Sequence, residues 1–357
     1  MGLFKDMLRG DESLFLNENA LDYEFLPKIL PYRESEQRYL ATCIKPLLQS
    51  RNGKNLFVFG APGIGKTAAM KFVFRDLEEE TDDVVPIYIN CWQKNTTYKI
   101  MLELCDILGV KFTHNKRTDE LFAIVKQILN KKTAVFAFDE VDKLEDYDFL
   151  YSILEEIYKK SVFLITNHEE WLDELDQRIK SRLLPEKVQF KQYNAVETKG
   201  IMKQRLDYAF VSGVWEDAAF EEAAIKAAAF GDIRTGLYLL REAGNSAESH
   251  SSRKVLKKHV EEALSKMADF STKNSDELED ETKVILDLVK ENTGQRIGDL
   301  FKMYQKKGGK SVYKTFQRKI RKLADNRFIS VEKVTGGTEG TTTIVHAETT
   351  KSLNDFS

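Results

Sequence analysis

Short apolar runs alternate with amphipathic stretches along the first half of the chain. The apolar runs are compact and end in glycine, polar or charged residues, which is typical of buried strands. They cover residues 55–59, 84–89, 133–138 and 161–166, and stretches with helical spacing cover 35–49, 67–79, 98–108 and 119–129. Strands that alternate with helices predict an α/β fold, with a parallel sheet and helices on both of its faces.

The pattern changes after about residue 193, where strand-like runs give way to helical periodicity. Helical stretches cover 196–210, 217–230, 233–246 and 254–267, so we expect a small all-helical domain. From about residue 281 the pattern predicts helices at 282–291, 297–306 and 311–324, followed by strands at 328–334 and 342–347. Three helices followed by a hairpin form the winged-helix plan, a helix-turn-helix variant.

These patterns divide the chain of 357 residues, which is too long for one typical core, into six parts. We expect an N-terminal arm at 1–25, an α/β domain at 26–193, a helical domain at 194–270, a polar linker at 271–280, a winged-helix domain at 281–350 and a tail at 351–357.

Composition narrows the class of protein. The chain is 42% hydrophobic and 31% charged, as ordinary globular proteins are, and it carries three cysteines and five histidines. Their spacing fits neither a disulfide framework nor a zinc site, which favours a reducing compartment. No apolar run approaches the length of a membrane span, and the N-terminus lacks a signal-peptide pattern. We therefore expect a cytoplasmic protein without a membrane partner.

A complete phosphate-loop motif follows the first predicted strand. Glycines there let backbone N–H groups close around phosphate oxygens, and the helix after them directs its dipole at the same anion. Lys66 is expected to reach the β- and γ-phosphates of ATP, and the Thr67 hydroxyl to bind Mg²⁺. The predicted ATP-binding residues of the motif are Gly60, Ala61, Pro62, Gly63, Ile64, Gly65, Lys66, Thr67 and Ala68, and we add Tyr193 and Arg205 to them.

Two carboxylates follow the third predicted strand. Asp139 and Glu140 come directly after an apolar run, and open α/β sheets bind ligands at this edge. We expect Asp139 to hold Mg²⁺ and Glu140 to orient or deprotonate the attacking water. The alternative is an exposed acidic strand end, which is common, but the phosphate loop upstream favours catalysis.

The Asp139–Glu140 pair at a strand end resembles the AAA+ ATPases. That resemblance implies that Asn167 contacts the γ-phosphate and the water, and that Arg182, with Arg178 in reserve, reaches the nucleotide of a neighbouring subunit. It also implies that Arg234 contacts the phosphates in its own subunit, from a helical lid domain. The alternatives are a turn asparagine, a solvated basic face and an ordinary helix-start arginine.

The wider motif order is similar to that of the archaeal replication initiators, relatives of the origin recognition complex and of the cell-division-cycle helicase loader. The order comprises Leu30-Pro31-Tyr32-Arg33-Glu34, Ile89-Asn90-Cys91, Asp139 to Leu144, Gly231-Asp232-Ile233-Arg234 and a terminal winged helix. The similarity covers roughly residues 25 to 350. It implies slow, switch-like ATP hydrolysis to ADP, binding to double-stranded origin DNA, recruitment of the replicative helicase, contact with other initiator protomers and a nucleoid association. It also implies a DNA contact at Gln93, Lys94 and Asn95.

Charge supports a nucleic-acid partner independently. Residues 306–333 hold ten basic and two acidic residues, a net +8 in a chain whose net charge is −3. Val312, Phe316, Ile320 and Leu323 form the expected core stripe of the third helix, which leaves its other faces free for the major groove. The predicted DNA-binding residues are Lys310, Tyr313, Lys314, Gln317, Arg318, Arg321 and Lys322, with Gly336 and Gly337 at the tip of the wing. The alternative is a solvated helix or a protein-contact surface.

Two other functions fit the same features. One is a regulatory or defence-related ATPase whose winged helix contacts protein or controls transcription. The other is a helicase-loading adaptor that does not bind duplex DNA alone. Binding to a short inverted repeat near a replication start would favour the initiator.

Overall fold

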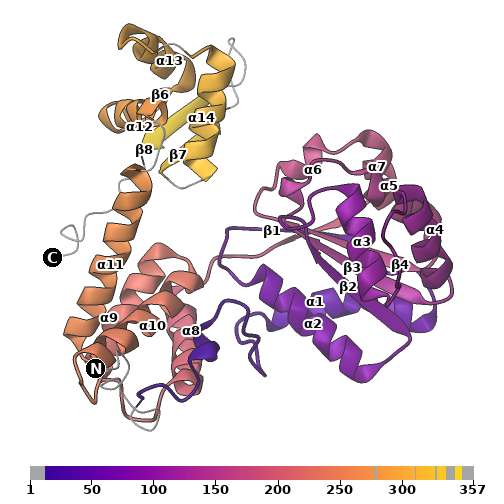
Figure 1. Cartoon of the computed structure of the whole chain (residues 1–357), viewed down its shortest axis with the longest axis horizontal. Helices are drawn as coiled ribbons and strands as arrows, with labels where there is room; N and C mark the ends of the chain where they lie inside the picture. The colour runs from indigo at the N-terminus through magenta and orange to yellow at the C-terminus, as the bar shows by residue number, and fades with distance from the viewer. Residues whose placement is uncertain (1–12, 277–279, 310, 326–327, 335–341, 348–357) are drawn as a thin grey trace. The chain divides into compact units, whose positions relative to one another are not determined.

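The computed structural model contains two compact units, Met1–Ala263 and Leu264–Ser357 (Figure 1). It describes the whole chain except residues 1–12, 277–279, 310, 326–327, 335–341 and 348–357. The finer division into six parts stays a prediction. Every helix in the described ranges is too short or too polar to cross a membrane.

A parallel sheet forms the centre of the first unit, as predicted, but it has five strands and not the four that the sequence indicated. Its strands are β1 (Leu56–Phe59), β2 (Val84–Asn90), β3 (Thr133–Asp139), β4 (Lys160–Thr166) and β5 (Glu186–Gln189), in the order β2-β3-β4-β1-β5. All adjacent pairs are parallel, and Asn90 pairs with Asp139 and Phe59 with Thr166, so these strands end at one edge. The edge strand β5 was missed because three of its four residues are polar, so the strand leaves no apolar run in the sequence.

Helices cover both faces of the sheet. The helices of this domain are α1 (Glu34–Ile44), η2 (Lys45–Gln49), α2 (Lys66–Glu80), α3 (Thr97–Ile107), α4 (Thr118–Leu129), η3 (Val141–Lys143), α5 (Asp148–Glu156), α6 (Trp171–Glu174) and α7 (Gln177–Leu183). Side chains alternate along β3, so that Phe136 and Phe138 pack with α3, α4 and α5 while Val135 and Ala137 pack with α1 and α2. This alternation gives the sheet two separate hydrophobic cores.

Four helices follow the sheet, as the periodicity predicted. They are α8 (Ala195–Ala209), α9 (Asp217–Phe230), α10 (Ile233–Ser249) and α11 (Lys257–Asp276). The described part of the N-terminal arm, with η1 (Glu18–Leu21), packs on α8 and α10. Helix α11 continues through residues 271–276, so most of the segment predicted as a linker is helical.

The second unit begins within α11, and its described residues after that helix form three further helices and a small antiparallel sheet. Its elements are α12 (Asp280–Glu291), β6 (Gln295–Arg296), α13 (Ile297–Lys306), α14 (Tyr313–Asp325), β7 (Ile329–Val334) and β8 (Thr342–Ala347), and the sheet order is β6-β8-β7. The three helices and the hairpin match the predicted order. The two-residue strand β6 was not predicted, since it is too short to show a pattern.

The predicted core stripe of α14 needs one correction. Phe316, Ile320 and Leu323 are buried, but the Val312 side chain is 68% exposed. The helix begins at Tyr313, and the Val312 carbonyl accepts hydrogen bonds from the N–H groups of Thr315 and Phe316. Val312 therefore precedes the first helical turn, and its side chain does not follow the helical spacing.

This difference predicts opposite outcomes for two alanine substitutions. Phe316→Ala should destabilise the second unit by about 3–5 kcal/mol, because it removes a buried aromatic ring and leaves a cavity. Val312→Ala should change stability by less than about 0.5 kcal/mol, because the side chain is exposed. Hydrogen exchange of the α12–α14 amides in the full chain measures both. Equal losses of protection would contradict the corrected core.

Candidate nucleotide-binding site

The phosphate loop connects β1 to α2 at the carboxyl edge of the sheet. Gly63 and Gly65 have φ angles of 75° and 87°, a region that glycine adopts without steric cost. An added Cβ atom at Gly63 would lie 1.9 Å from Asp232 Oδ1, and one at Gly65 would lie 2.6 Å from the Tyr193 hydroxyl oxygen. Neighbouring side chains thus occupy the space that other residues would need.

The Lys66 ammonium lies inside this loop. Its Nζ donates hydrogen bonds to the carbonyl oxygens of Gly60 (2.7 Å) and Ala61 (2.9 Å) and to Asn167 Oδ1 (2.7 Å). The side chain is buried, and burial lowers the pKa of Lys66 to about 8. The fold therefore brings Lys66 and Asn167 together, although 101 positions separate them in the sequence.

Thr67 and Asp139, the two predicted Mg²⁺ ligands, also meet at this edge. The Thr67 hydroxyl donates to Asp139 Oδ2 at 2.5 Å, and the Tyr88 hydroxyl donates to the same oxygen at 2.9 Å. Tyr88 is an addition to the predicted site, and burial raises the pKa of its phenol well above the usual range. Its place in the apolar run of β2 gave no sign of this contact.

The donor set fits Mg²⁺ in a nucleotide complex. Mg²⁺ is bound by one or two carboxylates together with substrate phosphates and water, and not by an all-protein cage. Thr67 and Asp139 supply a hydroxyl and a carboxylate beside the loop. Among the described residues, no group of three or more His, Cys, Asp or Glu side chains is arranged to hold a metal ion.

Glu140 follows Asp139 in a left-handed conformation, with a φ of 57°. Its backbone N–H donates to Asp139 Oδ1 at 2.9 Å. Burial, and then the nearby carboxylates of Asp139 and Asp142, raise the pKa of Glu140 above its usual value. A carboxylate whose proton affinity is raised in this way is suited to accept a proton from water.

The start of α10 contacts the phosphate loop directly. The Ile233 N–H donates to the Gly63 carbonyl at 3.3 Å, and Asp232 caps the helix by accepting from the Arg234 N–H at 2.9 Å. The Arg234 guanidinium pairs with the Asp232 carboxylate at 2.7 Å. Arg234 thus lies near the loop, but its partner in this structure is Asp232.

Tyr193 and Arg205, both predicted to bind ATP, have different surroundings. Tyr193 is buried against Gly65 of the loop, and burial raises its pKa to about 12. Arg205 donates to the backbone carbonyls of Ala20 (3.1 Å) and Phe25 (2.8 Å), and burial lowers its pKa to about 10. Arg205 therefore holds the N-terminal arm on α8, and these contacts do not support its assignment to ATP binding.

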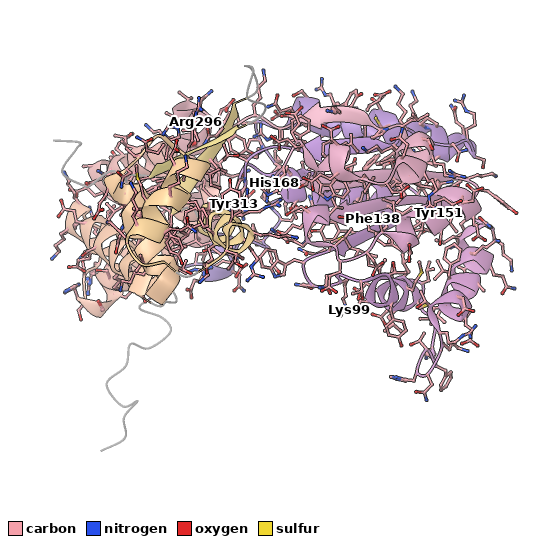
Figure 2. The ribbon with its side chains drawn as sticks, turned by 90° about the horizontal axis from the view of Figure 1, so that it is seen from above. Lys99, Phe138, Tyr151, His168, Arg296 and Tyr313 are labelled. Carbon is pink, nitrogen blue, oxygen red and sulfur yellow. The ribbon has the colours of Figure 1, made fainter. Side chains whose placement is uncertain are left out.

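Both candidate finger arginines lie on α7. Arg182 pairs with Glu155 of α5 at 2.5 Å, and its guanidinium lies 4.9 Å from the ring centroid of Tyr151. Tyr151 is labelled in Figure 2. Arg178 pairs with Asp176 and is 78% exposed. The choice between Arg178 and Arg182 stays open, because either arginine would act on the nucleotide of a neighbouring subunit and not on its own.

The second unit exposes the predicted polar residues of α14. Tyr313, Lys314, Gln317, Arg318 and Arg321 are all exposed. Lys310, Gly336, Gly337 and the side chain of Lys322 lie outside the described residues.

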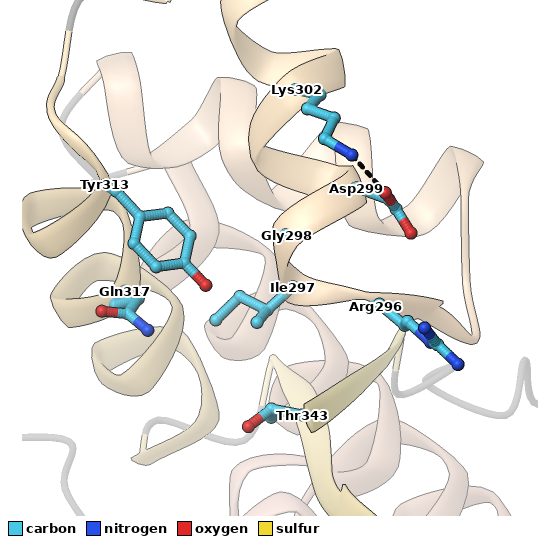
Figure 3. Close-up of a pocket in the computed structure, with 8 residues that line it drawn as sticks. All are labelled: Arg296, Ile297, Gly298, Asp299, Lys302, Tyr313, Gln317 and Thr343. Carbon is cyan, nitrogen blue, oxygen red and sulfur yellow. Dashed lines mark hydrogen bonds and ion pairs between the residues drawn. The ribbon is translucent and has the colours of Figure 1, made fainter. Parts of the chain in front are cut away.

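A cavity of about 250 Å³ lies between β6, β8, α13 and α14 (Figure 3). Tyr313 and Gln317 of α14 face it from one side. Its lining residues are Arg296, Ile297, Gly298, Asp299, Lys302, Tyr313, Gln317 and Thr343.

The polar residues after β2 have partners inside the first unit. Lys94 pairs with Glu103 at 2.6 Å. Asn95 donates to Glu145 at 2.5 Å and accepts from Lys99 at 2.7 Å. A DNA contact by Lys94 or Asn95 would have to replace these interactions.

Comparisons with known proteins place these features in context. An AAA domain model matches residues 49–174, and a Cdc6 AAA+ ATPase-type lid domain model matches residues 199–265. ORC1-type DNA replication protein 1 of Archaeoglobus fulgidus is 32% identical over 90% of this chain and 84% of its own. ORC1-type DNA replication protein 2 of Methanothermobacter thermautotrophicus is 30% identical over 96% and 94%. The structure of the Aeropyrum pernix ORC1 protein in complex with DNA has a TM-score of 0.70 and 26% identity, over 93% of both chains.

The contact between Gly63 and Asp232 predicts an unequal effect of two glycine substitutions. Gly63 and Gly213 have similar φ angles of 75° and 79°, but an added Cβ atom at Gly213 would have nothing within 4 Å. Gly213→Ala should cost about 1–2 kcal/mol of backbone strain. Gly63→Ala should cost more, because it must also displace the start of α10. Urea unfolding without nucleotide measures both, and equal costs would argue against the contact.

Proposed function

The chain belongs to the family of archaeal ORC1-type and Cdc6 replication initiators, and we propose that it acts as an initiator that binds origin DNA under the control of ATP. The ATP half of this proposal rests on one observation. Four predicted site residues lie together at one edge of the sheet, namely Lys66, Thr67, Asp139 and Asn167. The family is one of AAA+ ATPases, with a parallel α/β domain and a helical lid.

Each residue at that edge has a distinct chemical role in the proposal. Lys66 releases the loop carbonyls and Asn167 to bind the β- and γ-phosphates, which are stronger acceptors for an ammonium group. Thr67 and Asp139 would hold Mg²⁺, which when bound would neutralise charge on the phosphates. Glu140 orients the attacking water and accepts its proton, and the Asn167 amide holds the water or the γ-phosphate in line.

Hydrolysis is slow and works as a switch in this proposal. Arg234 leaves Asp232 to bind the γ-phosphate in its own subunit, which couples the lid to the nucleotide. Arg182 or Arg178 completes the site of a neighbouring initiator protomer. An isolated protomer therefore lacks one positive charge that the transition state needs.

The second unit is the proposed DNA-binding domain. A winged helix of this order places one helix in the major groove, and α14 exposes Tyr313, Lys314, Gln317, Arg318 and Arg321 on its surface. The net charge of +8 over residues 306–333 favours binding to the phosphate backbone of DNA. We propose that the wing lies against the minor groove. The family's role in replication also leads us to propose the replicative helicase as a partner.

The ATP half is tested by two variants with different outcomes. Lys66→Ala should weaken ATP binding at least about tenfold, because a charge-assisted contact contributes about 1.5–3 kcal/mol. Glu140→Gln should retain ATP binding but lower hydrolysis at least about a hundredfold, because the amide cannot accept the proton. Fluorescent-nucleotide titration and phosphate release measure the two steps. Wild-type turnover by Glu140→Gln would assign the base to another residue.

The DNA half is tested by footprinting the purified protein on its own genome, with and without ATP. We expect ATP-dependent protection of short inverted repeats near a replication start. Arg318→Ala should weaken the preferred site by about 1–3 kcal/mol and random duplex much less, since it removes a candidate contact to a base edge. Lys290→Ala, an exposed position on α12 with the same charge change, is the matched control. Protection at promoters alone would instead support transcription control.

A further inference from the structure

Arg33 is a buried guanidinium that the proposed chemistry of the site does not use. It precedes α1 and is only 4% exposed, although arginine is seldom buried without a specific set of partners. All three of its guanidinium nitrogens donate hydrogen bonds. Those partners show what the buried charge holds in place.

The principal partner of Arg33 is a carbonyl of the phosphate loop. Nε and Nη2 both donate to the Ile64 carbonyl oxygen, at 3.1 and 2.9 Å, and Nη2 also donates to the Lys191 carbonyl oxygen at 2.6 Å. The remaining nitrogen donates to the Tyr32 carbonyl and to Glu36. The guanidinium therefore joins the loop to the segment that follows β5.

The flat face of the same guanidinium lies on an aromatic ring. Its Cζ atom is 3.8 Å from the ring centroid of Tyr193, which is close enough for a cation–π contact. The Tyr193 hydroxyl is the group that lies against Gly65. Arg33 thus supports the loop twice, directly at Ile64 and through Tyr193 at Gly65.

The Ile64 contact determines where the next N–H group points. In a trans peptide the C=O of one residue and the N–H of the next point in opposite directions. Because Arg33 holds the Ile64 carbonyl, the Gly65 N–H must point away from Arg33. Gly65 has no Cβ atom to oppose a rotation of this peptide, so the loop's own sequence does not prevent a flip.

We propose that Arg33 is a positioning residue that keeps the Ile64–Gly65 peptide oriented with its N–H toward the nucleotide's β-phosphate. This proposal rests on the nucleotide-binding half of the proposed function. Arg33 contributes to affinity for nucleoside di- and triphosphates without touching them. A nucleoside monophosphate lacks the β-phosphate and does not depend on this peptide.

The test compares ADP with AMP on the full chain, by competition against a fluorescent ADP. Arg33→Lys keeps the charge, but a single ammonium group cannot donate in the same fork or lie flat on the ring. We expect ADP affinity to fall roughly tenfold or more, which corresponds to the loss of one hydrogen bond to a charged group. AMP affinity should fall less than about twofold. Arg75→Lys is the control, because Arg75 also donates to a backbone carbonyl, that of Pro27. It should leave the ADP to AMP ratio unchanged.

Three outcomes separate the possibilities. Equal losses for ADP and AMP, or no loss for either, would overturn the positioning role. Failure of the wild-type protein to prefer ADP over AMP would overturn the nucleotide site itself. If Arg33→Lys does not fold, Tyr193→Leu takes its place, because it removes the ring under the guanidinium and keeps an apolar side chain. The same selective loss for ADP is then expected, and equal losses would again overturn the proposal.

Discussion

The constraint on which the first unit depends is a glycine-rich phosphate loop, in which the Ile64 side chain packs into the core. Its glycines let backbone N–H groups close on an anion, but they provide no packing that would hold the loop in shape. The support comes from outside. Asp232 lies against Gly63, Tyr193 lies against Gly65, and Arg33 holds the carbonyl between them. These residues come from the lid, the segment after β5 and the start of α1, so three separate segments pack on the loop.

The charged side chains of the site are also bound to the groups that shape the loop. Lys66 is satisfied by loop carbonyls and Asn167, and Arg234 is satisfied by Asp232. In the proposed function a bound phosphate would replace these partners, so the affinity for nucleotide would reflect an exchange of hydrogen bonds and not their simple addition. Asp232 also caps α10, so the exchange proposed for Arg234 would act on the helix that contacts the loop.

An element could be predicted from the sequence when its burial produces a pattern of apolar residues within the element itself. Strands β1, β3 and β4 are almost wholly buried and β2 is partly buried, so they appear as apolar runs. The edge strand β5 is charged and half-buried, and only its pairing with β1 identifies it. Val312 follows the apolar spacing of α14, yet it lies outside the helix. The polar composition of residues 271–280 predicted a linker, although polar residues are compatible with helix α11, which extends through residues 271–276.

The sequence by itself determined the phosphate loop, the strand-end carboxylates and the strands β1 to β4 of the parallel sheet, because each depends on residue types at short spacing. Only the tertiary structure decided which distant side chains meet there. Tyr88 reaches Asp139 and Arg33 reaches Ile64 across 51 and 31 positions of the sequence, while Arg205 turns to the N-terminal arm. No short motif encodes such contacts, because a buried donor takes whichever acceptor the packing of separate elements brings within about 3 Å of it.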